Sequence, residues 1–325
     1  MAEVRDARAE AQALLEPHMQ ARVLEPAPPA DTDPQWFARD EAAVDALTGD
    51  QVVTPTSAGS TTWDALARGN NAIAAFARDR WLGNWRRLGP VPEGFGAART
   101  DLNRLAFYVV AAARQSVNGK MGLRWSKDGF GTPFFGPDVQ VRLEGVEVVL
   151  QAAASVHSAP LTSLAEASRL VGVPLDLHRG ARFAVPEPGD PDRTLAVEAP
   201  HVAFASDWFG FVTSVLEELR LLAGPTDSAS RVQLWPEHFD VAMEMGDADA
   251  SRRAGYGGSP GDAAHPEPYL YVTPWTEADP TADFWNDDSF GGASLAHADL
   301  LAAGDQRQAA LDFFTEGLRI LGLAS

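Results

Sequence analysis

Hydrophobic and polar positions along the chain follow two different periods, and the change comes near residue 120. Before that point, apolar residues recur every three to four positions in alanine- and leucine-rich stretches, which predicts helices. After it, short segments rich in β-branched residues are separated by Gly, Pro and Asp, which predicts strands and tight turns. The clearest example is 138–144, where polar and apolar residues alternate as in a half-buried strand.

These periods predict a definite set of elements. The expected helices are 3–21, 34–47, 65–81, 101–117, 206–223 and 306–321, and Thr100 and Asp101 are expected to cap the fourth. The expected strands are 120–125, 138–143, 146–151, 231–235, 238–245 and 269–273. Because short turns join the strands, we expect an α+β fold with an antiparallel sheet and flanking helices.

Two parts of the chain resemble each other, which suggests an internal duplication. Residues 163–170 and 294–301 share Ser, Leu, two Ala and Leu, and the helices around 217–222 and 316–321 share Glu, Leu, Arg and Leu. Chance similarity between alanine-rich helices is the alternative. The expected organisation is an N-terminal helical segment over 1–100, a first α+β half over 101–225 and a second, similar half over 226–325.

Charge narrows the range of partners. The chain has 45 acidic and 26 basic residues, and its formal net charge is −19. The negative electrostatic potential of such a chain repels phosphate backbones and anionic lipid surfaces, so we expect no nucleic-acid or membrane partner. No signal peptide or membrane-length apolar run is visible, so a cytoplasmic location is expected. The absence of cysteine excludes disulfides, thiolate metal sites and cysteine nucleophiles.

None of the common catalytic motifs assigns this chain to an enzyme class. No GxGxxG or P-loop pattern follows a predicted strand. Residues 257–261 fit G-x-S-x-G, but Pro260 has no backbone N–H to serve as the oxyanion donor that follows the serine in a nucleophile elbow. We interpret this stretch as a glycine-rich turn.

The best candidate for a metal site combines one predicted strand with the loop that follows. In a strand from His238, an imidazole and two carboxylates share one face, while the alternate residues form the other, apolar face. Three prolines stiffen the loop 259–269, which carries further acidic and imidazole groups. Such a set suits zinc, manganese or iron, or acid–base chemistry. The predicted metal ligands are His238, Asp240, Asp262, His265 and Glu267.

Aromatic residues crowd the last third of the chain, as they do around many small-molecule sites. A core of large rings and a solvated polar strand face are the alternatives to a ligand site here. Asn286, Asp287 and Asp288, beside Trp285, would add polar groups to such a pocket. The expected ligand-binding residues are Trp235, Glu244, Tyr256, Tyr271 and Trp275.

The function expected from these features is binding of a small ligand or a divalent metal, at a site between the 238–244 strand and the 256–275 loop. A metal-dependent hydrolase, in which the metal activates water, is a second hypothesis. A non-catalytic interaction protein built from two similar halves is a third. The sequence does not decide whether the protein is an enzyme.

Several longer stretches carry a resemblance to a known group of proteins. They are 104–110, 129–136, 232–240 and 266–272. On these stretches the chain resembles an uncharacterised family of actinobacterial hypothetical proteins over about residues 75–320. The resemblance implies no activity, cofactor or site residue, and residues 1–60 fall outside it.

Overall fold

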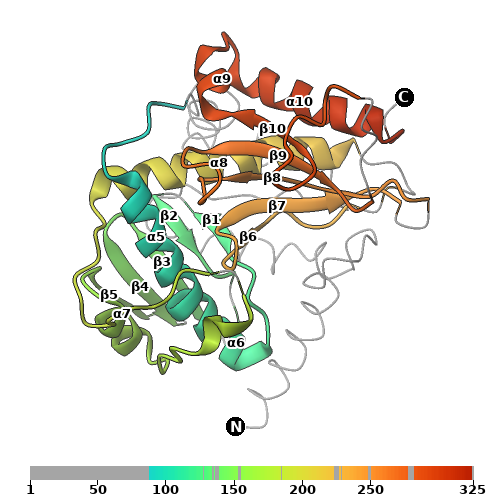
Figure 1. The fold of residues 1–325 in the computed structure, drawn as a ribbon. Helices are drawn as coiled ribbons and strands as arrows, with labels where there is room; N and C mark the ends of the chain where they lie inside the picture. The colour runs from blue at the N-terminus through green and yellow to red at the C-terminus, as the bar shows by residue number, and fades with distance from the viewer. Residues whose placement is uncertain are drawn as a thin grey trace, which may run out of the picture. The chain divides into compact units, whose positions relative to one another are not determined.

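A computed structural model describes residues 88–323, apart from 127, 134, 136–138, 153–154, 184, 223–226, 228, 248–249 and 277–281 (Figure 1). The helices predicted at 3–21, 34–47 and 65–81 lie outside the described residues, as does most of the predicted N-terminal segment 1–100. The described part is an α+β fold with two five-stranded antiparallel sheets, which confirms the predicted fold class.

A long helical stretch precedes the first sheet. It consists of α5 (Phe95–Leu105), the π-helical segment η4 (Ala106–Val110) and α6 (Ala111–Asn118). The predicted helix 101–117 therefore starts too late, because Gly94 at φ 79° precedes the first turn and Asp101 lies inside the helix. Gly119 at φ 76° ends α6, as the Asn-Gly pair predicts.

The first sheet is a meander in which each strand pairs with the next one along the chain. Its strands are β1 (Arg124–Ser126), β2 (Gly129–Gly131), β3 (Val139–Glu144), β4 (Glu147–Ala152) and β5 (Ser155–Pro160). The connection then continues through α7 (Leu164–Val171) and the 3₁₀ turn η5 (Arg179–Arg182) to α8 (Ala199–Leu221). The α8 helix begins earlier than the predicted 206.

The second sheet repeats this order with the same neighbour-to-neighbour pairing. Its strands are β6 (Gln233–Trp235), β7 (Asp240–Met245), β8 (Ala254–Ser259), β9 (Tyr269–Pro274) and β10 (Ala293–Ala296). The helices α9 (His297–Ala302) and α10 (Gln306–Ile320) follow. Asp305 caps α10 through its carboxylate, so the predicted helix from 306 is confirmed.

Each half thus has a five-stranded meander, a short helix and a long helix. Both long helices carry the same i,i+3 ion pair near their ends, Glu217–Arg220 at 3.0 Å on α8 and Glu316–Arg319 at 2.6 Å on α10. Two similar sheet-and-helix halves are therefore present in the fold. A common origin of the halves stays a prediction.

The sequence match that suggested the duplication does not align equivalent positions of the two short helices. Ser163 is the N-cap of α7 and accepts a hydrogen bond from the N–H of Glu166 at 3.2 Å. Its sequence match, Ser294, lies inside β10, and α9 starts only at His297. The segments correspond as elements, with a shift of two residues.

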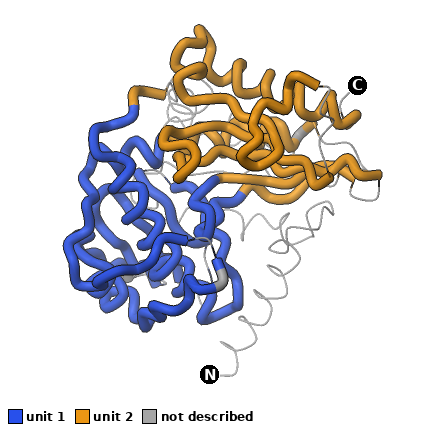
Figure 2. Tube along the Cα trace, viewed as in Figure 1, with its two compact units in different colours: residues 1–19, 91–207, 233–240 blue, residues 20–90, 208–232, 241–325 orange. Residues whose placement is uncertain are grey.

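The described residues form two compact units (Figure 2). The first comprises 91–207 and 233–240, and the second comprises 88–90, 208–232 and 241–323. The division falls inside α8, whereas the sequence placed it between 225 and 226. None of the described helices is both long and apolar enough to cross a membrane.

Four strands, β2, β5, β8 and β10, were not predicted, and β8 was interpreted wrongly as a glycine-rich turn. Gly257 and Gly258 lie in the middle of β8, where a Cβ on Gly257 would overlap the ring of Tyr271. A Cβ on Gly258 would overlap Val212 of α8. These glycines allow close packing on both faces of the sheet, a tertiary reason that local propensity does not reveal.

The helices α8 and α10 pack on one face of the second sheet. Val212 of α8 approaches Gly258, and Val272 lies against Gly317 of α10. Gly258 and Val272 belong to the same face, because Gly258 pairs with Leu270, two residues from Val272. The opposite face carries Tyr269 and Tyr271, and the candidate site lies there.

Candidate functional site

The loop 260–268 between β8 and β9 is organised by the carboxylate of Asp262. Its Oδ1 accepts hydrogen bonds from the N–H groups of Ala264 at 2.7 Å and His265 at 2.8 Å. Its Oδ2 accepts a hydrogen bond from the hydroxyl of Tyr269 at 2.6 Å. The N–H of Asp262 donates to the carbonyl of His265 at 2.7 Å. Asp262 therefore fixes both the turn and the start of β9.

The His265 imidazole lies between two carboxylates and against an aromatic ring. Its Nε2 lies 2.8 Å from Oδ2 of Asp287, which is hydrogen-bonding distance. Its Nδ1 lies 3.8 Å from Oδ1 of Asp262, too far for a hydrogen bond. The ring centroid is 4.4 Å from that of Tyr269. The imidazole thus joins the β8–β9 loop to the segment that precedes β10.

Asp287 is itself held firmly. Its backbone forms a bridge with Gly292, with both N–H to O distances at 3.0 Å. Its Oδ1 accepts hydrogen bonds from the hydroxyl of Ser289 at 2.6 Å and from the N–H of Ser289 at 3.1 Å. The side chain is only 8% exposed, so these partners replace most of its water.

Both carboxyl groups are ionised at neutral pH. Burial raises the pKa of Asp262, but hydrogen bonds from Tyr269 and from the loop N–H groups outweigh it, and the pKa falls below the usual value. Burial likewise raises the pKa of Asp287, and hydrogen bonds from Ser289 and Ser294 lower it further than burial raises it. The site therefore carries negative charge, and Asp262 exposes 44% of its side chain to solvent.

Aromatic rings surround these groups on the same face of the sheet. The centroid of Phe290 lies 6.2 Å from His265, 6.3 Å from Tyr269 and 6.2 Å from Tyr271. Tyr271 lies over Gly257, which makes room for its ring on the sheet. We call this group the His265 cluster; its members are Asp262, His265, Tyr269, Tyr271, Asp287 and Phe290.

The structure brings together only part of the predicted metal set. Asp262 and His265 are neighbours, whereas Glu267 is exposed. Glu267 acts on a different imidazole: burial lowers the pKa of His297, and the charge of Glu267 raises it. Within the described ranges, no three His, Asp or Glu side chains are grouped so that they could hold a metal ion. Metal binding by the five predicted residues stays a prediction.

The other two predicted ligands lie in the first unit, and the predicted strand starts two residues too early. The N–H groups of His238 and Phe239 both donate to the carbonyl of Trp235, and Phe239 has φ 55°. His238 is therefore in an exposed turn and not on a strand face. Asp240, the first residue of β7, is only 6% exposed. The expected row of polar groups on one open strand face is wrong.

The five predicted ligand-binding residues also lie in different environments. Glu244 forms an ion pair with Arg253 at 3.0 Å, and the Arg253 guanidinium lies 4.8 Å from the ring of Trp275. Tyr256 is fully buried, with its ring 6.2 Å from Phe314 of α10, so it is a core residue. Trp235 lies at the end of β6 in the first unit. Among the five, only Tyr271 joins the His265 cluster.

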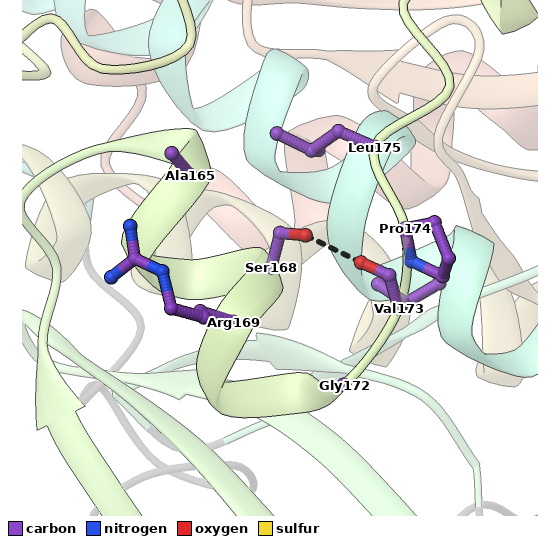
Figure 3. A pocket seen from close by; sticks show the side chains of 7 residues that line it. All are labelled: Ala165, Ser168, Arg169, Gly172, Val173, Pro174 and Leu175. Carbon is purple, nitrogen blue, oxygen red and sulfur yellow. Dashed lines mark hydrogen bonds between the residues drawn. The ribbon is translucent and has the colours of Figure 1, made fainter.

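A second candidate is a hollow of about 380 Å³ in the first unit, at the end of α7 (Figure 3). It is wide open to solvent, and its hydroxyl is already used, because Ser168 donates to the carbonyl of Val173. Arg169 is paired with Glu166 at 2.5 Å on the surface. Among the residues that line the hollow, only Arg169 is charged, and its charge is already balanced by Glu166. It is lined by Ala165, Ser168, Arg169, Gly172, Val173, Pro174 and Leu175.

Tyr269, Asp287 and Phe290 belong to the site but were not predicted as site residues. Asp287 was noted only as one of three polar residues beside Trp285. The available signal was the Gly291-Gly292 pair, which allows the segment to turn back so that Asp287 pairs with Gly292. Local sequence does not show which distant histidine that aspartate meets.

Comparisons with protein-family models, with curated proteins and with solved structures gave no match. The resemblance to an actinobacterial family and the cytoplasmic location stay predictions. The site is therefore interpreted from its own geometry.

Proposed function

We propose that the protein binds a small organic cation at the His265 cluster. The observation that supports this most directly is an ionised carboxylate, Asp262, that is fixed by three hydrogen bonds yet 44% exposed beside aromatic rings. A carboxylate attracts the charge of an ammonium group, and an aromatic face attracts it through the ring quadrupole. The net charge of −19 adds a long-range attraction for cations.

A comparison of the two halves supports a specialised role for this region. In the first half, β3 and β4 are joined by Gly145 and Val146 alone. In the second half, the corresponding connection is the loop 260–268, and a second long connection, 275–292, leads to β10. Both long connections supply members of the His265 cluster. Added loops on a repeated scaffold are common positions for binding residues.

An organic cation fits this cluster better than a metal ion does. Asp262 and His265 offer two ligands, whereas zinc sites in proteins have three or four protein ligands. Asp287 is already engaged by His265 and Ser289, and rearranging it would leave buried donors without partners. A metal-dependent hydrolase would need at least a third metal ligand, which no described residue supplies beside Asp262 and His265.

Choline and its uncharged isostere 3,3-dimethylbutan-1-ol test the proposal in a thermal unfolding assay. Choline is expected to raise the Tm in a saturable way, since a ligand at 100 times its Kd stabilises the folded state by about 2.7 kcal/mol. The alcohol has the same shape without the charge, and it is expected to give no shift. Equal shifts from both compounds would contradict the proposal.

Two variants localise the effect. Asp262→Asn removes the charge but keeps an oxygen that can accept the loop N–H bonds, so the loop should persist and the choline shift should be lost. Glu267→Gln changes the net charge equally in the same loop and should keep the shift. A choline shift that survives Asp262→Asn would rule out this site. A shift with Mn²⁺ or Zn²⁺ but not with choline would replace the cation with a metal.

A further inference from the structure

The outer edges of the two sheets, β5 and β10, differ in how their backbone groups are satisfied. In β10 the N–H of His297 donates to the carbonyl of Pro268. Hydrogen-bonded pairs alternate along an antiparallel ladder, so the backbone of Ser294 faces away from β9. The Asn286 carboxamide meets it, accepting from the Ser294 N–H at 2.8 Å and donating to the Ser294 carbonyl at 3.1 Å. A side chain thus occupies this edge.

The equivalent edge of β5 has no such cover among the described residues. The N–H of Leu161 donates to the carbonyl of Val146, so the same alternation turns the backbone of Val156 and Ser158 away from β4. No described group makes a hydrogen bond to these outward N–H and C=O groups. Val156 is 48% exposed, and Ser158 is also exposed, so the edge is accessible.

The sequence of β5 leaves this edge unusually open to pairing. Natural edge strands are protected by charged side chains, bulges or proline. Residues 155–160 contain no Lys, Arg, Asp or Glu, and their single proline, Pro160, stands at the end of the strand. The two outward residues, Val156 and Ser158, offer two N–H donors and two carbonyl acceptors.

We propose that β5 binds an extended, positively charged peptide segment of a partner protein by strand addition. Main-chain hydrogen bonds to Val156 and Ser158 would supply the affinity. Charge complementarity favours a cationic partner. Glu147 of β4, which pairs across the ladder with Pro160, is exposed beside one end of this edge, and the whole chain carries a net charge of −19. A second copy would bring together two strongly negative chains, so a cationic strand is the better occupant. This inference is independent of the cation site at His265.

A fluorescent peptide of alternating Thr and Val with Lys at each end is the probe, followed by fluorescence anisotropy with the full chain. It should bind saturably and slow the amide hydrogen exchange of Val156 and Ser158. The same peptide with N-methyl groups on alternate residues lacks the pairing N–H groups and should not bind. A version with Glu in place of Lys should bind at least tenfold more weakly.

The decisive variant is Ser158→Pro, which removes one outward N–H without touching the bonds to β4. It should weaken peptide binding at least tenfold, while Ser158→Thr, which keeps the N–H, should bind as the wild type does. Far-UV circular dichroism and Tm establish that both variants fold. Equal binding by Ser158→Pro and wild type, or by the N-methylated peptide, would overturn the proposal. A lack of peptide binding would overturn it as well. So would a concentration-dependent dimer that Ser158→Pro abolishes, because the occupant would then be a second copy of the chain.

Discussion

At the scale of single residues, Asp101 shows how burial changes the role that a sequence suggests. The sequence favours a helix cap, but the residue lies inside α5 and is 2% exposed. Its carboxylate accepts hydrogen bonds from Arg104 at 2.7 Å, from Arg193 at 2.9 Å and from the N–H of Ala196 at 2.7 Å. Burial raises its pKa, and these partners lower it below the usual value. Asp101 therefore ties α5 to the segment before α8.

Asp101→Asn should lower the free energy of unfolding at pH 7 by about 1–3 kcal/mol, because two arginines lose a charged acceptor in a buried place. The folded-state pKa lies below the unfolded value of about 3.9, so the ionised group stabilises the fold above that pH. This contribution is lost as the pH falls through the folded pKa. Urea unfolding at pH 7 and pH 3 should show the difference between wild type and variant shrinking at pH 3.

The exposed pair of Glu166 and Arg169 provides the control for Asp101. Both side chains are more than half exposed, so solvent and salt screen their attraction. Glu166→Gln should leave the urea midpoint unchanged at both pH values. A wild-type to Asp101→Asn difference that does not depend on pH would show that the ionised carboxylate is not the stabilising group.

At the scale of elements, the π-helical segment η4 is the least regular part of the long helix. The wider turn is accompanied by a side chain that bonds to its backbone: Arg179 donates to the carbonyl of Phe107 and lies 4.3 Å from the Phe107 ring. Two further N–H groups of Arg179 donate to Oε1 of Gln115, at 3.1 and 2.6 Å. Burial lowers the Arg179 pKa to about 10, which keeps it protonated at neutral pH. Arg179 thus connects η5 with η4 and α6.

Arg179→Met should cost about 1–3 kcal/mol in the free energy of unfolding, since the carbonyl of Phe107 and the amide of Gln115 lose their donor. Arg179→Lys should recover only part of this, because an ammonium lacks the planar fork that reaches both acceptors. Urea unfolding gives the loss, and faster amide exchange within 106–112 would localise it. Arg169→Met, on the surface of α7, is the control and should have no effect; an equal loss there would contradict the assignment.

At the scale of the molecule, the two halves share an order of elements but differ in their connections and edges. The second half has long connections that build the His265 cluster, while Asn286 covers its outer strand. In the first half only two residues join β3 to β4, and no described group covers the outer edge of β5. The two proposals therefore fall on different halves. This division agrees with a repeated scaffold on which loops and edges, not the sheet itself, carry the recognition chemistry.

The sequence by itself determined the fold class, much of the strand pattern and part of the site. Period-two alternation and short turns are local properties, so β3, β4 and β9 were predicted close to their positions. The strands that were missed are glycine-rich, such as β8, or lack a regular alternation of polar and apolar residues, such as β5. Their place in the sheet depends on neighbours that fit against them, such as Tyr271 over Gly257.

Only the tertiary structure decided which distant groups meet. Asp262 and His265 are close in sequence, and their shared loop was recognised, whereas Asp287 reaches His265 from the next connection. Asp101 meets Arg193 across 92 residues. Local pattern fixes which way side chains alternate and where turns fall, because those depend on backbone geometry within a few residues. The pairing of remote side chains depends instead on the lengths and paths of connections, which are set by how the whole chain packs.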